Sequence, residues 1–109
     1  MTTTVVIHLL KHEKGAKMAK HLRIVGIVQG VGYRASFEAQ ARALKLSGWV
    51  RNRRDGSVEA MVCGEAESLG KIIDWARRGP RSARVDDVSI ADVDDSLVQQ
   101  GIFQTIGTQ

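Results

Sequence analysis

The sequence predicts an α+β fold: one antiparallel sheet that carries two helices on one face, followed by a short extra strand at the C-terminal end. Three observations predict it. Stretches rich in β-branched residues alternate with two helical stretches in the order β-α-β-β-α-β. An Asp-Gly pair between the two middle β-rich stretches indicates a hairpin. Each helical stretch has one apolar side, and a single sheet with both helices on one face satisfies that order.

The chain has 109 residues, which suits one domain, because compact domains commonly contain roughly 100–150 residues. Residues 1–20 are expected to be a poorly ordered N-terminal extension, since residues 11–20 show no apolar stripe. Residues 21–109 are expected to form the domain. With 43% hydrophobic residues, the chain can build a core of modest size.

The first half of the domain begins with an expected strand at residues 22–28, which ends at a glycine-containing turn, residues 29–33. A helix is expected next, because Phe37, Ala41 and Leu44 recur at helical spacing. Gly48 is expected to end this helix.

The second half starts with strands at residues 49–52 and 58–63 on either side of the Asp-Gly turn. In the second of these, alternate residues share one face, as a half-buried strand requires; they are Val58, Ala60 and Val62. The following helix is the clearest element, with apolar residues at i, i+3, i+4 and i+7; these are Leu69, Ile72, Ile73 and Ala76. Gly79-Pro80 is expected to end it.

Two further strands, residues 85–93 and 102–106, are expected around a turn near residues 94–101. The complete order is the split βαβ, or ferredoxin-like, arrangement. This fold hosts many unrelated functions, so the order of elements assigns none.

Composition excludes several classes of protein. The formal net charge of +4 favours anionic partners, although charge balance bears on association and not on a particular reaction. A single cysteine, Cys63, excludes an internal disulfide and suits a reducing compartment. The longest apolar stretch near the start, residues 5–10, is far shorter than the roughly 20 residues that span a bilayer. We therefore expect a cytoplasmic protein with no membrane partner.

One segment, Gly-Ile-Val-Gln-Gly-Val-Gly-Tyr-Arg at residues 26–34, carries most of the chemical information. Gly30 and Gly32 remove side chains from a tight turn, so consecutive backbone N–H groups can converge on one point. The helix that follows adds free N–H groups and the positive end of its dipole. Arg34 adds a planar fork that matches phosphate oxygens. The segment predicts a phosphate site; the alternative is a structural turn beside a surface arginine.

A second segment, residues 48–56, reads Gly-Trp-Val-Arg-Asn-Arg-Arg-Asp-Gly. Asn52 ends a central strand of the predicted fold, where its amide can point toward the glycine turn. Taken alone, an asparagine before a hairpin is commonly part of the turn itself.

Together the two segments resemble the acylphosphatase family, whose first signature runs like Gly-x-Val-Gln-Gly-Val-x-x-Arg and is followed by Gly-Trp-Val-x-Asn and Asp-Gly-x-Val-Glu. The corresponding residues are 26–34, 48–52 and 55–59. The resemblance extends over about residues 21–107, and two independent motifs at matching separation make it specific. It implies a ferredoxin-like fold, in agreement with the order of elements.

The resemblance also implies an enzyme that hydrolyses the carboxyl–phosphate anhydride of a small acyl phosphate without a metal or other cofactor. Arg34 would bind the phosphoryl group together with backbone amides, and Asn52 would hold the attacking water. The amides are those of Gln29, Gly30, Val31, Gly32, Tyr33 and Arg34. Tyr33 stands where the family often has phenylalanine, which should change packing and not catalysis. We expect a monomer.

The alternative is a ferredoxin-like module without catalysis, either nucleic-acid-binding or regulatory. RNA-recognition domains share the order of elements but display stacking aromatics on their sheet. Residues 58–63 contain no aromatic residue, and aromatics make up only 5% of the chain, so no nucleic-acid partner is expected. His8, His12 and His21 all precede the glycine motif, so none is an obvious base or metal ligand.

Overall fold

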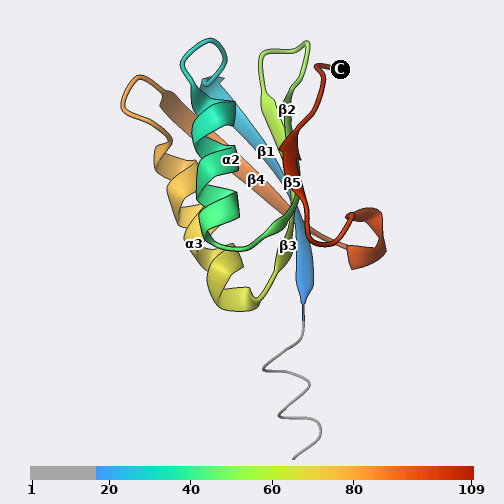
Figure 1. Ribbon diagram of the computed structural model, residues 1–109. Helices are drawn as coiled ribbons and strands as arrows, with labels where there is room; N and C mark the ends of the chain where they lie inside the picture. The colour runs from blue at the N-terminus through green and yellow to red at the C-terminus, as the bar shows by residue number, and fades with distance from the viewer. Residues whose placement is uncertain (1–16) are drawn as a thin grey trace, which may run out of the picture.

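The computed structural model describes residues 17–109 of the chain. Its elements follow the predicted order, with both helices on one side of the sheet (Figure 1), which confirms the ferredoxin-like α+β arrangement. They are β1 (Met18–Ile27), α2 (Tyr33–Ala43), β2 (Ser47–Asn52), β3 (Val58–Gly64), α3 (Ala66–Arg78), β4 (Arg84–Val93), a short 3-10 turn η1 (Asp95–Leu97) and β5 (Phe103–Thr105).

The five strands are arranged in the order β4-β1-β3-β2-β5. β1 pairs antiparallel with β3 and β4, and β2 pairs antiparallel with β3, as predicted. The extra strand β5 runs parallel to β2, so the complete sheet is mixed. Its direction follows from the path of the chain. β4 ends at the end of the sheet where β2 begins, and a strand that starts there beside β2 must run the same way.

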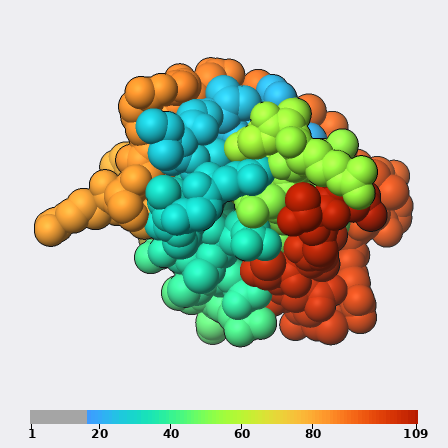
Figure 2. Space-filling model, turned by 90° about the horizontal axis from the view of Figure 1, so that it is seen from above, coloured from blue at the N-terminus to red at the C-terminus, as the bar shows by residue number. Residues whose placement is uncertain are grey.

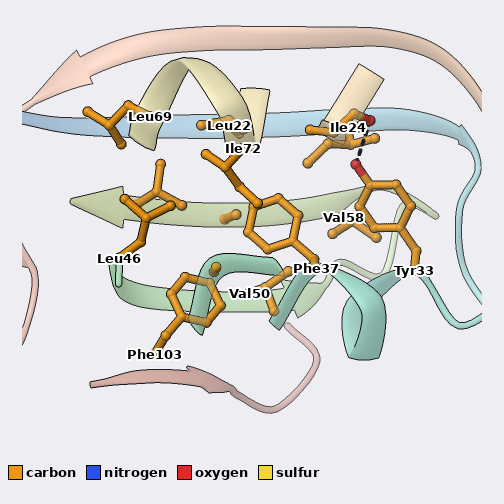
Figure 3. Close-up of a cluster of buried hydrophobic side chains, with 14 of the residues drawn as sticks. Leu22, Ile24, Tyr33, Phe37, Leu46, Val50, Val58, Leu69, Ile72 and Phe103 are labelled. Carbon is orange, nitrogen blue, oxygen red and sulfur yellow. Dashed lines mark hydrogen bonds between the residues drawn. The ribbon is translucent and has the colours of Figure 1, made fainter. Parts of the chain in front are cut away.

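The core lies between the sheet and the two helices (Figure 3). In α3 the predicted stripe is confirmed: Leu69, Ile72 and Ala76 are buried, and Ile73 packs against the same cluster. The largest fully buried side chains come from both layers; they include Tyr33, Phe37, Leu22, Ile24, Val50 and Val58. This packing fixes how α2 and the strand ends lie relative to one another.

The start of β1 differs from the predicted domain boundary. Residues 18–20, assigned to the extension, belong to the strand: Met18 pairs with Gly64 of β3, and Ala19 lies opposite Cys63 and Val93. Ala19 is 4% exposed because the chain near η1 covers it. The sequence did not indicate this contact, because Ala19 is the only buried residue among residues 17–20 and its side chain is small. Residues 1–16 of the predicted extension lie outside the described part.

The end of the first helix also differs from its prediction. α2 ends at Ala43, and Lys45 takes the left-handed conformation with φ of 59°. Gly48 does not end the helix; it lies inside β2. A Cβ at Gly48 would come 1.8 Å from the Met61 carbonyl oxygen, so close approach of β3 requires glycine there.

The helix-free face of the sheet is partly covered as well. Ala19, Met61, Cys63 and Val98 form a second buried cluster, against which Trp49 and Val93 pack. β3 is therefore buried on both faces in its second half, although the alternation of Val58, Ala60 and Val62 predicted one buried face. The segment around η1 supplies the extra cover, which local periodicity does not reveal.

Four segments meet at one end of the sheet: the β1–α2 connection, the β2–β3 hairpin, the α3–β4 connection and the chain after β5 (Figure 1). Figure 2 looks onto this end. Backbone hydrogen bonds join the β2–β3 hairpin to the chain after β5. Gln109 N–H donates to the Asn52 carbonyl at 3.2 Å, and Arg54 N–H donates to the Gln109 carbonyl at 3.0 Å. In residues 17–109, neither helix has the length and apolar character that a membrane span needs.

Candidate active site

Two glycines shape the connection between β1 and α2. Gly30 and Gly32 have φ of 75° and 80°, in the left-handed region that residues with a Cβ adopt only at a cost. A Cβ added at either position would meet no atom within 4 Å. Backbone conformation, and not lack of room, therefore requires glycine here. Gly32 is also the N-cap of α2, and no side chain caps that helix end.

The backbone N–H groups of this turn remain free for an external acceptor. Within the described part of the chain, those of residues 30–35 donate to no protein acceptor. The first such bond of α2 runs from Ser36 N–H to the Gly32 carbonyl, at 3.1 Å. Because the start of a helix also concentrates partial positive charge, the turn presents a donor surface suited to an anion.

Arg34 and the turn line a pocket of about 220 Å³. The remaining lining comes from the residue just after β1, from α2 and from β5; the full set is Val28, Gly30, Gly32, Tyr33, Arg34, Ala35 and Thr105. Among residues 17–109, Arg34 makes no ion pair with a carboxylate. An unpaired guanidinium beside free amides makes this pocket electropositive.

A larger hollow of about 510 Å³ lies near the other end of α2, between the start of β2 and the start of β5. Arg42 and Lys45 line it, but Arg42 is already engaged by the Phe103 carbonyl at 3.1 Å and by Glu38 at 3.7 Å. It also faces the C-terminal end of the helix, where partial charge is negative. Size therefore does not identify the anion site, and the donor groups favour the smaller pocket.

Asn52 is the last residue of β2 and shares a sheet face with the fully buried Val50. Its side-chain oxygen Oδ1 is buried and, among the described residues, has no hydrogen-bond partner. An unpaired buried polar atom costs about 1–3 kcal/mol, so few are retained without a role. This oxygen can accept a hydrogen bond from a small donor such as water.

Gln29 ties the glycine turn to the β2–β3 hairpin. Its side-chain Nε2 donates to the carbonyl of Arg53 at 2.7 Å and to that of Ser57 at 2.8 Å. Arg53 directly follows Asn52, so these bonds hold the turn beside the end of β2. From the sequence, only the backbone amide of Gln29 was expected to take part, and these side-chain bonds were not. Both acceptors are backbone atoms more than 20 residues away, and no side-chain motif indicates them.

The hairpin itself is held by Asp55. Its Oδ1 accepts from the Ser57 hydroxyl at 2.6 Å and from Ser57 N–H at 2.9 Å, and its Oδ2 accepts from Arg23 at 2.9 Å. The bonds from Ser57, with that from Arg23, hold the pKa of Asp55 well below its usual range. The Asp-Gly pair thus forms the predicted turn, and the ionised carboxylate keeps the end of β2 in place.

Tyr33 contributes packing to the site and not a reactive hydroxyl. Its side chain is 1% exposed, and the hydroxyl donates to the Ala76 carbonyl at 2.7 Å. Burial raises the pKa of the phenol. The ring packs against Trp75 with centroids 5.3 Å apart, as expected for a position that phenylalanine can also fill.

Other reactive side chains lie away from the pocket. His21 pairs with Glu59 at 2.6 Å on the helix-free face, and Cys63 is buried in the second cluster there. His8 and His12 lie outside the described residues. Residues 17–109 contain no group of three or more His, Cys, Asp or Glu side chains placed to hold a metal ion. Thr105, which the sequence analysis did not single out, lines the pocket because β5 brings it beside α2.

The chain is similar to known proteins over nearly all of the described part. The family model described as Acylphosphatase matches residues 20–104. A protein named acylphosphatase from Acidovorax sp. (strain JS42) is 51% identical over 73% of this chain and 82% of its own length. The solved structure of an acylphosphatase from Coxiella burnetii has a TM-score of 0.77 and 34% identity, covering 86% of this chain and 96% of that one. That of an acylphosphatase from Bacillus subtilis has a TM-score of 0.77 and 31% identity, covering 82% and 98%.

These similarities agree with the glycine turn and the ferredoxin-like arrangement, and the chain belongs to the acylphosphatase family.

Proposed function

We propose that the pocket between the glycine turn and β5 hydrolyses acyl phosphates, with Arg34 and Asn52 as its catalytic residues. One observation carries the proposal. Free backbone N–H groups and an unpaired arginine share a pocket at the same end of the sheet as Asn52, whose buried Oδ1 has no partner among the described residues. Donors for an anion and an acceptor for a water molecule are the two parts that the reaction of this family needs.

The phosphoryl group would lie against the turn. Its equatorial oxygens would accept hydrogen bonds from the amides of residues 29–34, and the Arg34 guanidinium would bind them through its planar fork. Charge on these oxygens has to be stabilised in the transition state of phosphoryl transfer. Fixed backbone donors in a partly buried pocket do this without reorganising during the reaction.

Asn52 would position the attacking water. A carboxamide has no useful basicity, so it cannot remove a proton, but its oxygen can accept a hydrogen bond from water and hold it in line with phosphorus. The proton would pass to an oxygen of the substrate's own phosphate group. The lining that residues 17–109 provide contains no carboxylate, imidazole or thiol, which fits a reaction in which the enzyme supplies no general base.

The leaving group explains why so few residues suffice. An acyl phosphate releases a carboxylate, and carboxylic acids have pKa values of roughly 4, so the departing oxygen needs no proton at neutral pH. Tyr33, whose hydroxyl is engaged by Ala76, is therefore not required as an acid. An unactivated phosphate ester would leave as a strongly basic alkoxide, and we expect this site to hydrolyse it poorly.

The test is hydrolysis of acetyl phosphate with EDTA present, in wild type, Arg34→Ala and Asn52→Ala. Wild type should release phosphate with the chelator, and each variant should lose about a hundredfold or more in kcat. Arg78→Ala and Gln104→Ala, which truncate exposed side chains of the same types, should keep full activity. Wild-type activity in Arg34→Ala or Asn52→Ala would remove that residue's role, and loss of activity with EDTA would establish a metal requirement.

We also propose that the protein acts in the cytoplasm as a monomer. The location is supported by the one cysteine, which is a buried free thiol that a reducing compartment preserves. Sedimentation analysis at micromolar concentration should give the mass of one chain, and fractionation of cells should place the activity in the cytoplasmic fraction.

A further inference from the structure

β5 is the outermost strand of the sheet, so one of its sides has no neighbouring strand. The two residues that flank β5 bond with β2: the Ile102 carbonyl accepts from Gly48 N–H at 2.8 Å, and Ile106 N–H donates to the Val50 carbonyl at 2.9 Å. The backbone groups of Phe103 and Thr105 therefore point to the other side, toward α2. Such edge groups need partners when they are not exposed to water.

Two side chains of α2 provide these partners. Oε1 of Glu38 accepts both from Thr105 N–H at 2.8 Å and from the Thr105 hydroxyl at 3.1 Å. One turn further along the helix, Nε of Arg42 donates to the Phe103 carbonyl at 3.1 Å. The helix thus binds the edge strand at two points. Both ties are charge-assisted, because one has a carboxylate acceptor and the other a guanidinium donor. Glu38 makes two bonds to Thr105, whereas Arg42 makes one to Phe103.

The two ties differ in what they hold. Thr105 lines the phosphate pocket together with Arg34, whereas Arg42 and Phe103 line the larger hollow near the other end of the helix. Glu38 lies one helical turn after Arg34, so the two side chains project from the same face of α2. Thr105 also pairs with Val50, two residues before Asn52. Glu38 therefore controls the position of a pocket wall, although it does not line the pocket.

The bond at Glu38 also fixes what the Thr105 hydroxyl can do. Its one hydrogen is committed to the carboxylate, so the oxygen can only accept further hydrogen bonds. The donor side chain in the pocket is Arg34. An oxygen held in this state can align the guanidinium and does not compete with it for the phosphate oxygens.

We propose that Glu38 is a positioning residue of this active site, which holds Thr105 as the wall against which Arg34 is aligned for the phosphoryl group. The inference rests on the proposed function, because it assumes that phosphate binds beside Arg34. It also makes Thr105 a part of the site that the sequence motifs do not contain.

The test measures competitive inhibition by inorganic phosphate, together with KM and kcat for acetyl phosphate. Glu38→Ala should raise the inhibition constant and KM by about tenfold, as expected for loss of hydrogen bonds to a charged group. Glu38→Gln keeps an oxygen acceptor for both bonds and should stay within about threefold of wild type. Thr105→Val, which removes the hydroxyl alone, should fall between them, and adding it to Glu38→Ala should cause little further loss because the two residues act as one unit.

Arg42→Ala is the matched control, because it removes the second tie between α2 and β5 and the 3.7 Å ion pair with Glu38, but leaves both bonds from Thr105 to Glu38 in place. It should lower the melting temperature but leave the phosphate inhibition constant unchanged. The positioning role is overturned if Arg42→Ala and Glu38→Ala weaken phosphate binding equally, or if Glu38→Ala changes only the melting temperature. It is also overturned if Glu38→Gln and Glu38→Ala both strengthen phosphate binding, since the carboxylate would then act through its charge alone.

Arg34→Ala in the same assay separates this inference from the proposed function. If Arg34→Ala binds phosphate as wild type does, the pocket assignment fails and the inference fails with it. If Arg34→Ala loses phosphate binding while Glu38→Ala retains it, the active site stands and only the role of Glu38 is wrong.

Discussion

Arginines in two regions of this molecule show how pairing separates structure from function. On the helix-free face, three side chains surround Glu59: His21 at 2.6 Å, Arg51 at 2.7 Å and Arg53 at 3.3 Å. At the glycine turn, Arg34 has no carboxylate partner within residues 17–109. The arginines around Glu59 form ion pairs within the protein and stabilise the sheet. The charge of Arg34 is available to bind an external anion.

The largest contrast should come from removing one arginine from each region. Arg34→Ala should lower kcat/KM for an acyl phosphate by about a thousandfold, because it deletes a charged donor to the phosphoryl group. Its melting temperature should stay close to that of wild type, since no ion pair is lost. Arg51→Ala should show the reverse, with activity nearly intact and stability lowered by about 1–3 kcal/mol. Steady-state kinetics and thermal unfolding of both variants check this, and equal activity losses would erase the distinction.

The ion pairs of Glu59 should make the stability of the protein depend on pH. Burial raises the pKa of Glu59, but the hydrogen bonds and charges of His21 and Arg51 outweigh it, so the pKa in the folded protein lies below the usual value. The unfolded chain therefore binds the proton first as pH falls. The stabilisation is complete above the unfolded value of about 4.3 and is lost as pH drops through the lower folded value.

Glu59→Gln should accordingly be less stable than wild type by about 2 kcal/mol at pH 7, and the gap should narrow below pH 4. Melting curves across this range measure it. Asp74→Asn, at an exposed carboxylate of α3 away from the start of the helix, should change stability far less than Glu59→Gln at pH 7. A stability difference between wild type and Glu59→Gln that stays constant with pH would contradict the stabilising role of the Glu59 charge.

The geometry of the candidate site could be predicted where it is local in sequence and not where it depends on pairing between distant segments. The turn of Gly30 and Gly32, and Arg34 after it, lie within one motif, whose glycines are required by left-handed backbone. The side-chain bonds of Gln29 and the approach of Thr105 to the pocket arise only when β1, β2 and β5 come together.

The same reason explains the errors in the fold. Gly48 was expected to end a helix because glycine often does so, but it serves a close contact with Met61 of the next strand. The parallel direction of β5 and the burial of Ala19 depend on the path of the chain across the sheet. Helical periodicity in α3, by contrast, records a single packed face and was predicted correctly.

A smaller effect should come from the shape of the anion-binding turn. Gly30→Ala should destabilise the protein by about 1–2 kcal/mol, because alanine is strained at a φ of 75° even where space is open. Part of that strain should be relieved by a twist of the turn, which weakens phosphate inhibition. Gly70→Ala is a useful comparison, since it lies in the exposed middle of α3 and alanine favours a helix, so stability should rise slightly. Equal stability changes in the two variants would rule out the left-handed requirement.

The smallest effect should come from exposed arginines around the site. The connection after α3 is held to the glycine turn by the Ser82 hydroxyl, which donates to the Val31 carbonyl at 3.1 Å. Arg81 is therefore close enough to attract an anionic substrate. Arg81→Glu should lower kcat/KM by about threefold at low salt, and the effect should fade at ionic strength near 1 M. Lys45→Glu, at the far end of α2, should have no such salt-dependent effect.

The most direct test of the central claim is a titration of ¹⁵N-labelled protein with inorganic phosphate, followed by amide NMR shifts. We expect saturable shifts that are largest for the N–H groups of residues 30–35, and we expect Arg34→Ala to lose them. Shifts centred instead on the hollow beside Arg42 and Lys45, or on the Glu59 cluster, would contradict the assignment of the glycine turn as the phosphate site.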